Sequence, residues 1–279
     1  MYKSLRYIRI AVSLIALAVP TWALLTGYES VFVRMQILTS LMTGVWLVLI
    51  FWALVTLIYG RLYCSTVCPL GTLIDCVSTG ARAVAPRGKH AKNFRYCSPT
   101  PTIQFIALLC FLVAVLSGSA FLPTLLDPYT AYARMVEELV ARPLGVPLDA
   151  MAYTISAMAA AIATATGVVM VAWRRGRLIC NTVCPIGTVM GMGSRKAYFH
   201  MEIDPDGCIN CGECERVCKA QCIKLPEKTI DTARCVVCFD CAAACPTKAL
   251  TYKSGRYRLD MPMMEAVGDG KANITSPDK

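Results

Sequence analysis

The sequence predicts an all-α membrane domain of four helices, followed by a small α+β domain that is built around cysteines. Three observations predict this architecture. The chain of 279 residues is 56% hydrophobic and only 16% charged, which is too apolar for an ordinary soluble domain. Long uncharged runs occupy its first two thirds. Nine of its 16 cysteines follow, between Cys208 and Cys245, and eight of them form a repeated pattern.

Four apolar runs are long enough to cross a bilayer. The first extends from Ile10 to Thr26 and is predicted as a transmembrane helix that is kinked at Pro20. A signal peptide is disfavoured because the apolar run continues past the small-residue site at 16–18. The other three runs carry no charge and reach about 20 residues, the length that spans the hydrocarbon. They are Ile37 to Ile58, Ile103 to Leu122 and Ala150 to Trp173.

Lysine and arginine gather on one side of the predicted membrane. They lie before the first helix, in the connection from Gly60 to Pro101, and after the fourth helix at Arg174, Arg175 and Arg177. The positive-inside rule therefore puts both termini and the cysteine-rich domain in the cytoplasm. The net charge of +10 is concentrated beside the apolar runs. That distribution is typical of membrane orientation and argues against a nucleic acid-binding face.

The eight cysteines repeat the pattern Cys-x2-Cys-x2-Cys-x3-Cys twice. This spacing is typical of bacterial ferredoxins with two [4Fe-4S] clusters, in which three thiolates of one loop bind one cube and the fourth binds the other. The predicted ligand sets are therefore crossed. Cluster 1 takes Cys208, Cys211, Cys214 and Cys245, and cluster 2 takes Cys235, Cys238, Cys241 and Cys218.

Zinc and disulfides fit this pattern less well. A structural zinc site needs four ligands in two pairs and would leave thiols idle, and disulfides need an oxidising compartment. Two local departures stand out: Lys219 follows Cys218 where proline is usual, and a ninth cysteine, Cys222, comes four residues after Cys218. We interpret Cys222 as a small buried residue beside a cluster, with a ligand role as the alternative.

An internal repeat links the two halves of the membrane domain. Residues 60–72, Gly-Arg-Leu-Tyr-Cys-Ser-Thr-Val-Cys-Pro-Leu-Gly-Thr, match residues 176–188 at 10 of 13 positions. Each copy follows an even-numbered predicted helix. The bundle is therefore predicted as two helix pairs related by a parallel repeat, with both motifs at the cytoplasmic surface.

Each copy contains Cys-x3-Cys-Pro, the last half of a ferredoxin motif, which cannot enclose a cube alone. Two copies together offer four thiols, enough for one more cluster or another thiophilic metal. These are Cys64, Cys68, Cys180 and Cys184. Redox-active thiols are a second interpretation, because a helix N-terminus lowers the pKa of a thiol. A purely structural turn is the third.

Other chemistry finds little support. The two histidines, His90 and His200, lie outside the apolar runs, so a bis-histidine membrane haem is excluded. No CxxC is followed by histidine, which excludes c-type haem attachment. No phosphate-binding loop or hydrolytic constellation is present, and no catalytic residue is assigned. One-electron transfer through clusters and thiols remains.

Taken together, these motifs resemble the NapH-type membrane ferredoxin of periplasmic nitrate reductase systems. The C-terminal half of NosR is similar, and CcoG, a copper-reducing accessory protein of cytochrome oxidase, is more distant. The resemblance covers the chain from the first helix to about Leu259. It implies a membrane-bound polyferredoxin of the bacterial inner membrane that works in anaerobic respiration. The implied domains are residues 1–198 in the membrane, 199–260 as the ferredoxin and 261–279 as a polar tail.

The function implied by the resemblance is electron transfer between quinol or a cytoplasmic donor and a respiratory reductase system, through protein partners. The alternative is a maturation or metal-reducing accessory factor for a respiratory metalloenzyme. A quinone headgroup needs polar partners near a membrane interface. The candidates are ordinary interface residues with no distinguishing pattern: Glu29, Arg34, Gln36 and Asp75.

Overall fold

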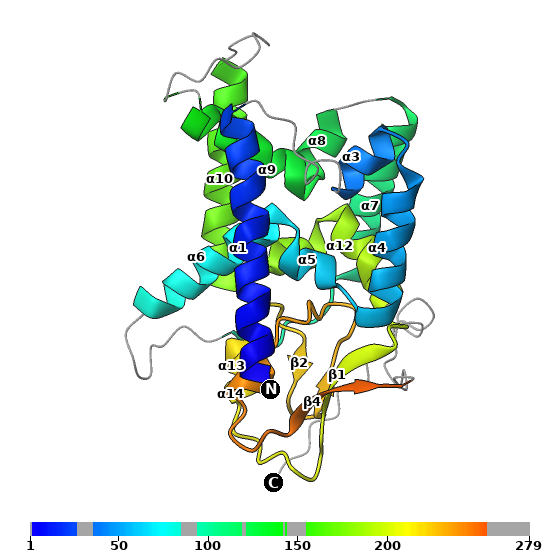
Figure 1. Cartoon of the computed structure of the whole chain (residues 1–279), viewed down its shortest axis with the longest axis vertical. Coiled ribbons are helices and arrows are strands. Elements are labelled where there is room, and N and C mark those ends of the chain that lie inside the picture. Colours follow the sequence, from blue (N-terminus) through cyan, green and yellow to red (C-terminus); the bar gives the residue numbers. More distant parts are fainter. Residues whose placement is uncertain are drawn as a thin grey trace, which may run out of the picture.

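A computed structural model describes residues 2–26, 36–84, 94–118, 121–141, 143 and 155–255. Long helices form one end of the molecule, and a small part with short strands and helices forms the other (Figure 1). One continuous core of buried side chains runs through both, from Trp52 in the helical part to Leu250 in the other. The two parts therefore pack as one body.

The helical part is built from two similar runs of elements. The first run comprises α1 (Tyr2–Thr26), α3 (Ile37–Met42), α4 (Trp46–Tyr59), α5 (Leu62–Thr66) and α6 (Pro69–Val84). The second comprises α7 (Pro101–Leu116), α8 (Phe121–Leu126), α9 (Pro128–Val136), the π-helical η1 (Glu137–Ala141), α10 (Ile155–Arg175), α11 (Leu178–Thr182) and α12 (Pro185–Ser194). In both runs a short helix and a proline-started helix follow the long apolar ones.

The four predicted membrane helices are found only in part. By length and composition, two helices in the described residues could cross a membrane, Tyr2–Thr26 and Ala157–Arg175, whereas α4 and α7 are shorter. The run from Ile37 to Ile58 was expected to be one helix, but it breaks at Gly44, which has a φ of +70°. The run from Ile103 ends early for the same reason, at Gly118 with a φ of +71°. Glycine adopts this left-handed conformation at little cost, so it ends a helix even inside an apolar run.

Helix α1 starts earlier than predicted and joins both parts. It is continuous through Pro20, and its first turns extend along the small part instead of ending at the bundle (Figure 1). There the Arg6 Nε lies 2.6 Å from Asp240 Oδ1, and the ring of Tyr2 stacks on Phe239 at a centroid distance of 6.1 Å.

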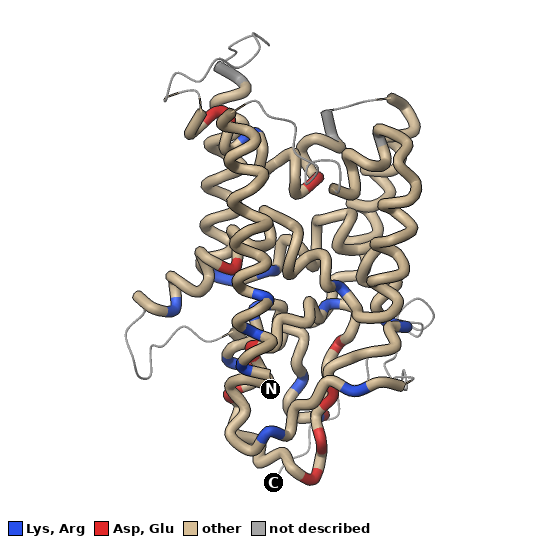
Figure 2. Tube along the Cα trace, in the orientation of Figure 1, with Lys and Arg blue, Asp and Glu red and all other residues tan. Residues whose placement is uncertain are grey.

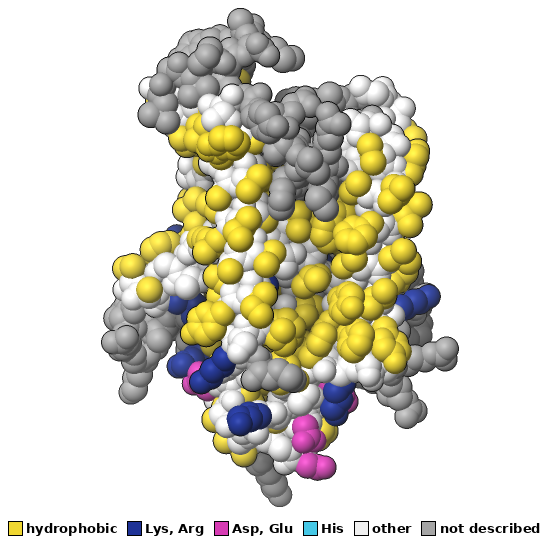
Figure 3. Space-filling model, in the orientation of Figure 1, with side chains coloured by type: hydrophobic (Ala, Val, Ile, Leu, Met, Phe, Trp, Pro, Cys, Tyr) yellow, Lys and Arg dark blue, Asp and Glu magenta, His cyan; other side chains and the backbone are white. Residues whose placement is uncertain are grey.

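The outer surface of the helical part is strongly apolar. Large hydrophobic side chains of α1, α4, α7 and α10 face outward, including Leu47 at 79% exposure, and they cover most of the visible helical surface (Figure 3). Most charged residues lie where the helices meet the small part and on the small part itself (Figure 2). Apolar surface of this extent is typical of a region that contacts lipid.

The small part has the α+β composition that was predicted. Strands β1 (Phe199–Ile203) and β4 (Leu250–Ser254) pair antiparallel, with Phe199 opposite Ser254 and Ile203 opposite Leu250. A second antiparallel pair joins β2 (Ile223–Lys224) and β3 (Thr229–Ile230). Two one-turn helices, α13 (Glu213–Val217) and α14 (Asp240–Ala244), lie side by side and carry cysteines.

The close contact between Gly71 and Cys64 within the first repeat copy leads to a first prediction. A Cβ on Gly71 would lie 2.5 Å from the carbonyl oxygen of Cys64, whereas a Cβ on Gly80 in the same helix would meet nothing within 4 Å. Gly71→Ala should therefore destabilise the protein by about 1–3 kcal/mol, the usual cost of overpacking. Gly80→Ala should stabilise it slightly through helix propensity. Thermal unfolding in detergent measures both, and equal stability of the two variants would contradict the packing described here.

A second prediction concerns Asp127, which is buried and caps α9 by accepting the Thr130 N–H at 2.8 Å. Burial raises the pKa of Asp127 to about 6, although the Thr130 hydrogen bonds oppose the shift. The folded state therefore holds this proton more tightly than the unfolded state, and the free energy of unfolding should fall as the pH rises from about 4 to 6.

Asp127→Asn keeps the cap without the charge. At pH 7.5 it should be more stable than the parent by up to about 3 kcal/mol, since each pKa unit corresponds to about 1.4 kcal/mol. The exposed Asp206 provides the control, because Asp206→Asn should leave the pH profile of stability unchanged. A parent and an Asp127→Asn variant with the same profile would show that Asp127 is ionised without cost.

Candidate iron-sulfur centres

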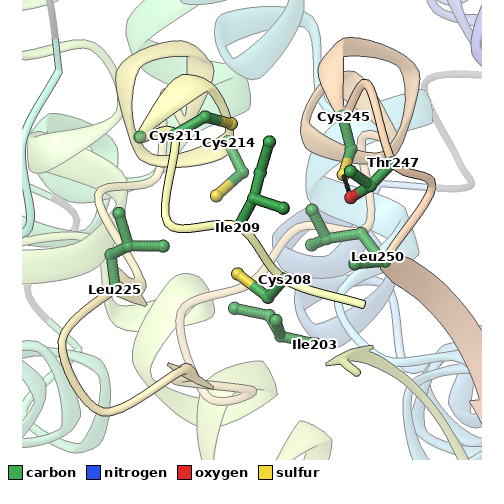
Figure 4. Close-up of a pocket in the computed structure, with 11 residues that line it drawn as sticks. Ile203, Cys208, Ile209, Cys211, Cys214, Leu225, Cys245, Thr247 and Leu250 are labelled. Atoms are coloured by element: carbon green, nitrogen blue, oxygen red, sulfur yellow. Dashed lines mark hydrogen bonds between the residues drawn. The ribbon is translucent and has the colours of Figure 1, made fainter. Parts of the chain in front are cut away.

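The cysteines predicted for cluster 1 surround one small cavity. Three come from the loop after β1 and from α13, and Cys245 reaches the same cavity from the end of α14 (Figure 4). They are Cys208, Cys211, Cys214 and Cys245. The remaining walls are largely apolar and include Ile203, Leu225 and Leu250. Cys211 is exposed, so this cavity lies close to the protein surface.

The cysteines predicted for cluster 2 surround a second cavity, deeper in the molecule. Cys218, at the end of α13, lines it together with Cys235, Cys238 and Cys241. A fifth thiol, Cys222, lines it too, and its Sγ lies 3.5 Å from that of Cys218. The ninth cysteine is thus buried in the wall of this cavity, and its packing and ligand interpretations both stay predictions. Iron binding by the predicted ligand sets stays a prediction.

The two cavities are framed by the same unusual backbone. Asn210 and Val237 have positive φ values of 55° and 51° at equivalent positions between the first two cysteines of each motif. Gln221 and Lys248, each three residues after the fourth cysteine of its motif, also have positive φ values, of 55° and 57°. A β-branched residue such as valine avoids the left-handed region, and such strain concentrates at functional sites.

The spacing of the thiols suits a polynuclear cluster. Within the part of the chain that the structure describes, no three Cys, His, Asp or Glu side chains come close enough to hold one metal ion. The thiols instead stand around the two cavities. Burial raises the pKa of Cys214 to about 11 and also raises that of Cys241, so these thiols are protonated unless a bound cation stabilises the thiolate. The residues present therefore fit iron-sulfur clusters.

The third group of cysteines comes from the repeated motif. Cys64 lies on α5, Cys68 precedes α6, and Cys180 and Cys184 hold the same positions at α11 and α12. Cys68 and Cys184 each accept a backbone N–H, from Gly71 at 3.4 Å and from Gly187 at 3.3 Å.

The fold brings these four thiols together. Burial raises the pKa of Cys68 and Cys184, and the neighbouring thiols raise both further: Cys64, Cys180 and Cys184 act on Cys68, and Cys180 and Cys64 act on Cys184. The other cysteines of the helical region stay outside the group. Cys76 and Cys110 are exposed, and Cys97 is half-buried beside Arg234.

A pair of arginines exchanges partners between the two repeat copies. Arg61 of the first copy donates from Nη2 to the carbonyl of Cys180 at 3.2 Å. Arg177 of the second copy donates from Nη1 to the carbonyl of Cys64 at 2.6 Å and from Nη2 to that of Gly71 at 3.2 Å. Both guanidinium groups are buried, although they were expected among the interfacial charges that set the membrane orientation. The structure corrects that expectation, since these arginines hold the four-thiol group together.

The four-thiol group contacts the loops of the second cavity. Asn181, which replaces Ser65 of the first copy, donates from Nδ2 to the carbonyl of Ala220 at 2.9 Å. Arg61 donates from Nη1 to the carbonyl of Ala233 at 3.1 Å, and the backbone N–H of Arg177 to that of Lys219 at 2.9 Å. These acceptors belong to the segments that carry Cys218, Cys222 and Cys235. The cluster 2 cavity therefore faces the helical part.

Asp75 has a role that its sequence context did not indicate. It accepts from Arg177 Nε at 2.8 Å and from Arg9 Nη1 at 3.1 Å, and Lys219 Nζ lies 3.8 Å away. Burial raises the pKa of Asp75, but the charges of Arg177, Lys219 and Arg9 outweigh burial and hold it well below its usual range. The sequence contains one sign that Asp75 is special: the equivalent position after the second repeat copy is Gly191, so the carboxylate is found in one half only. Asp75 is thus committed to ion pairs and is a poor quinone partner.

An apolar cavity of about 480 Å³ lies between α3, α4, α7 and α12. Its lining includes Trp52, Leu108, Pro185 and Met190, and the Met190 Sδ lies 4.0 Å from Cys64 Sγ. The cavity therefore adjoins the four-thiol group.

Gln36 directly precedes the cavity residues Ile37 and Leu38. It accepts the Tyr63 hydroxyl at 2.6 Å through Oε1, and its buried Nε2 has no hydrogen-bond partner in the part that the structure describes. Glu29 and Arg34 lie outside the described residues.

Comparison with known proteins points to the same chemistry. A family described as a 4Fe-4S binding domain matches residues 41–86 and 157–200, which contain the two copies of the Cys-x3-Cys-Pro motif. "Putative electron transport protein YccM" of Escherichia coli is 24% identical over 217 residues, which is 75% of this chain and 55% of that protein. A ferredoxin of Pyrobaculum islandicum is 35% identical over 66 residues, 23% of this chain and 62% of the ferredoxin.

An uncharacterized protein of Methanocaldococcus jannaschii is 37% identical over 75 residues, 27% of this chain. The chain spans 30% of the length of that protein and, as given above, about half of YccM. No solved structure matches. The resemblance to NapH and NosR expected from the motifs is supported only at a coarser level. The comparisons support an iron-sulfur electron-transfer protein with 4Fe-4S binding segments in duplicate.

Proposed function

We propose that this chain is a membrane-anchored iron-sulfur protein that moves electrons between quinol or a cytoplasmic donor and a respiratory reductase system. The observation that carries the proposal is the order of the cysteine groups. A near-surface cavity with four thiols comes first, a deeper cavity with five comes next, and the four-thiol group of the helical part contacts the loops of the second cavity. A series of this kind suits stepwise one-electron transfer.

In this proposal the ferredoxin cysteines hold two [4Fe-4S] clusters in the crossed sets given above, and the four thiols of the repeat hold a third. A bound cluster supplies reversible one-electron transfer. The protein contributes thiolates, an apolar lining that excludes water, and loops held in a fixed conformation. The third cluster is supported by the family match, which falls on both Cys-x3-Cys-Pro motifs.

Buried charge also favours a cluster at the four-thiol group. The hydrogen-bond partners of Arg61 are the side-chain oxygen of Asn181 and the carbonyls of Ala233 and Cys180, none of which is charged. A buried cation is stable only with compensating negative charge nearby. Four thiolates around a cluster supply that charge. Free redox thiols are less well supported, because burial raises the pKa of Cys68 and Cys184 and so lowers their nucleophilicity.

Membrane anchoring is supported by the two long apolar helices and the exposed apolar side chains around the helical part. Arg174 and Arg175 are exposed at the end of α10 on the side of the small part. The positive-inside rule favours the cytoplasm for that side. A cytoplasmic donor then meets the near-surface cavity first.

Quinol as the membrane-side partner is supported by the apolar cavity beside the four-thiol group. Its lining suits a ring and isoprenoid tail, since ligand pockets are mostly apolar with few polar groups. The Nε2 of Gln36 is a hydrogen-bond donor for a quinone oxygen at the edge of this region.

Iron counting tests the cluster assignment. Anaerobically purified protein should contain about 12 irons per chain if three [4Fe-4S] clusters bind. The double variant Cys64→Ala/Cys180→Ala should contain about 8, because only the ferredoxin sites remain. Cys110→Ala is the matched control, since Cys110 is exposed on α7, and its iron content should equal that of the parent. A parent with about 8 irons would limit the clusters to the ferredoxin part.

Reduction by quinol tests the membrane-side partner. A short-chain reduced quinol should bleach the cluster absorbance of the parent within seconds. Leu108→Trp, which fills the apolar cavity, should slow that reaction at least about tenfold, because a filled pocket excludes the ligand. Leu109→Trp is the control, because Leu109 faces outward at 55% exposure. Dithionite should reduce all three proteins equally.

The alternative, an accessory factor, predicts two different results. The clusters of the parent protein would not be reduced by quinol, and cells that lack the protein would assemble a reductase without its metal.

A further inference from the structure

Six charged side chains form one connected network at the junction of the two parts. Asp75 on α6 pairs with Arg9, Arg177 and Lys219, as described above. Lys219 Nζ also lies 3.2 Å from Asp240 Oδ2, and Asp240 pairs with Arg6 at 2.6 Å. The network thus joins α1, α6, α14, the start of α11 and the residue that follows Cys218.

This network carries an excess of positive charge. It contains four cations, Arg6, Arg9, Arg177 and Lys219, and two carboxylates, Asp75 and Asp240, which leaves an excess of two. All six except Arg6, whose side chain is 38% exposed, are buried. Water therefore screens this charge poorly, and its field acts strongly on neighbouring groups.

The excess charge faces the second cavity. Lys219 directly follows Cys218, and its partner Asp240 directly precedes Cys241, so the network meets the two loops that carry these cavity cysteines. Around the first cavity the charges are different. Glu213 and Arg216, on the helix that carries Cys214, pair with each other at 36% and 44% exposure.

Lys219 is the member of the network that distinguishes the two motifs. The position after the fourth cysteine is Lys219 in the first motif and Pro246 in the second. Lys219 is buried and bridges Asp75 of the helical part and Asp240 beside Cys241. Burying the charge of Lys219 costs desolvation free energy, which its two ion pairs offset.

We propose that Lys219 and its ion network raise the reduction potential of cluster 2 above that of cluster 1. The inference rests on the proposed function, in which both cavities hold clusters. Reduction adds one negative charge to a cluster, so a buried positive field favours the reduced form, and cluster potentials respond to charge and solvent exposure. One electron from the donor then moves from the near-surface cluster to the one beside the helical part, and no bond or proton is exchanged.

The test is an anaerobic redox titration of the full-length, iron-loaded protein in detergent, followed by electron paramagnetic resonance. The Cys211→Ser variant assigns the signals, because it alters cluster 1 only. Lys219→Gln should lower the equilibrium constant for the electron on cluster 2 against cluster 1 by about tenfold, or about 59 mV for one electron. Lys219→Arg keeps the charge and should stay within about threefold of the parent. Lys248→Gln removes an exposed lysine beside Cys245 and should also stay within that range, because water screens it.

Each remaining outcome separates the two proposals. If Lys219→Gln keeps its iron but shows unchanged potentials, or shifts both clusters equally, the charge effect is refuted while the cluster assignment stands. If Lys219→Gln loses cluster 2, the reduction potential of cluster 2 is measured in Arg6→Gln instead. A smaller decrease of that potential supports the effect of the network, and an unchanged potential overturns it. A parent without iron would refute the proposed function itself.

Discussion

The fold depends on the ion pair between Arg177 and Asp75. Arg177 is fully buried and bonds at once to Asp75, to the carbonyl of Cys64 and to that of Gly71. Removing one member of such a pair leaves an unpaired buried charge, which typically costs about 3–5 kcal/mol. This one ion pair links helix α6 to the four-thiol group, and Lys219 of the small part lies 3.8 Å from the same carboxylate.

Duplication appears at two levels, and in neither case are the copies equivalent. In the helical part, Arg61 and Arg177 clamp each other's motif, but Asp75 and Asn181 have no counterpart in the opposite copy. In the small part, the two cysteine motifs share their left-handed backbone positions, yet only one is followed by a buried lysine. The repeated sequences produce the shared geometry, and the residues that differ between the copies make the two ends of the series of cysteine groups unequal.

This difference between the two ends is visible in burial and charge. The first cavity is near the surface, the second is buried against the helical part, and the four-thiol group lies beyond it beside an apolar cavity. The unpaired positive charge is concentrated between the second and third groups. In the proposed function, an electron that enters at the near-surface cavity moves toward this positive charge, which favours inward transfer.

Cysteine spacing by itself determined the local chemistry. Cysteines separated by two residues on one loop surround a common point, and all four cysteines of each predicted set line one cavity, the second together with Cys222. The repeat was equally readable, and so was the apolar character of the helical part. Tertiary structure decided the rest: the helix breaks at Gly44 and Gly118, the burial of Arg61 and Arg177, and the convergence of Lys219 on Asp75. Local spacing fixes only neighbours along the chain, whereas the arginine burial and the Lys219 contact arise where segments over 100 residues apart come together, such as Arg177 and Asp75.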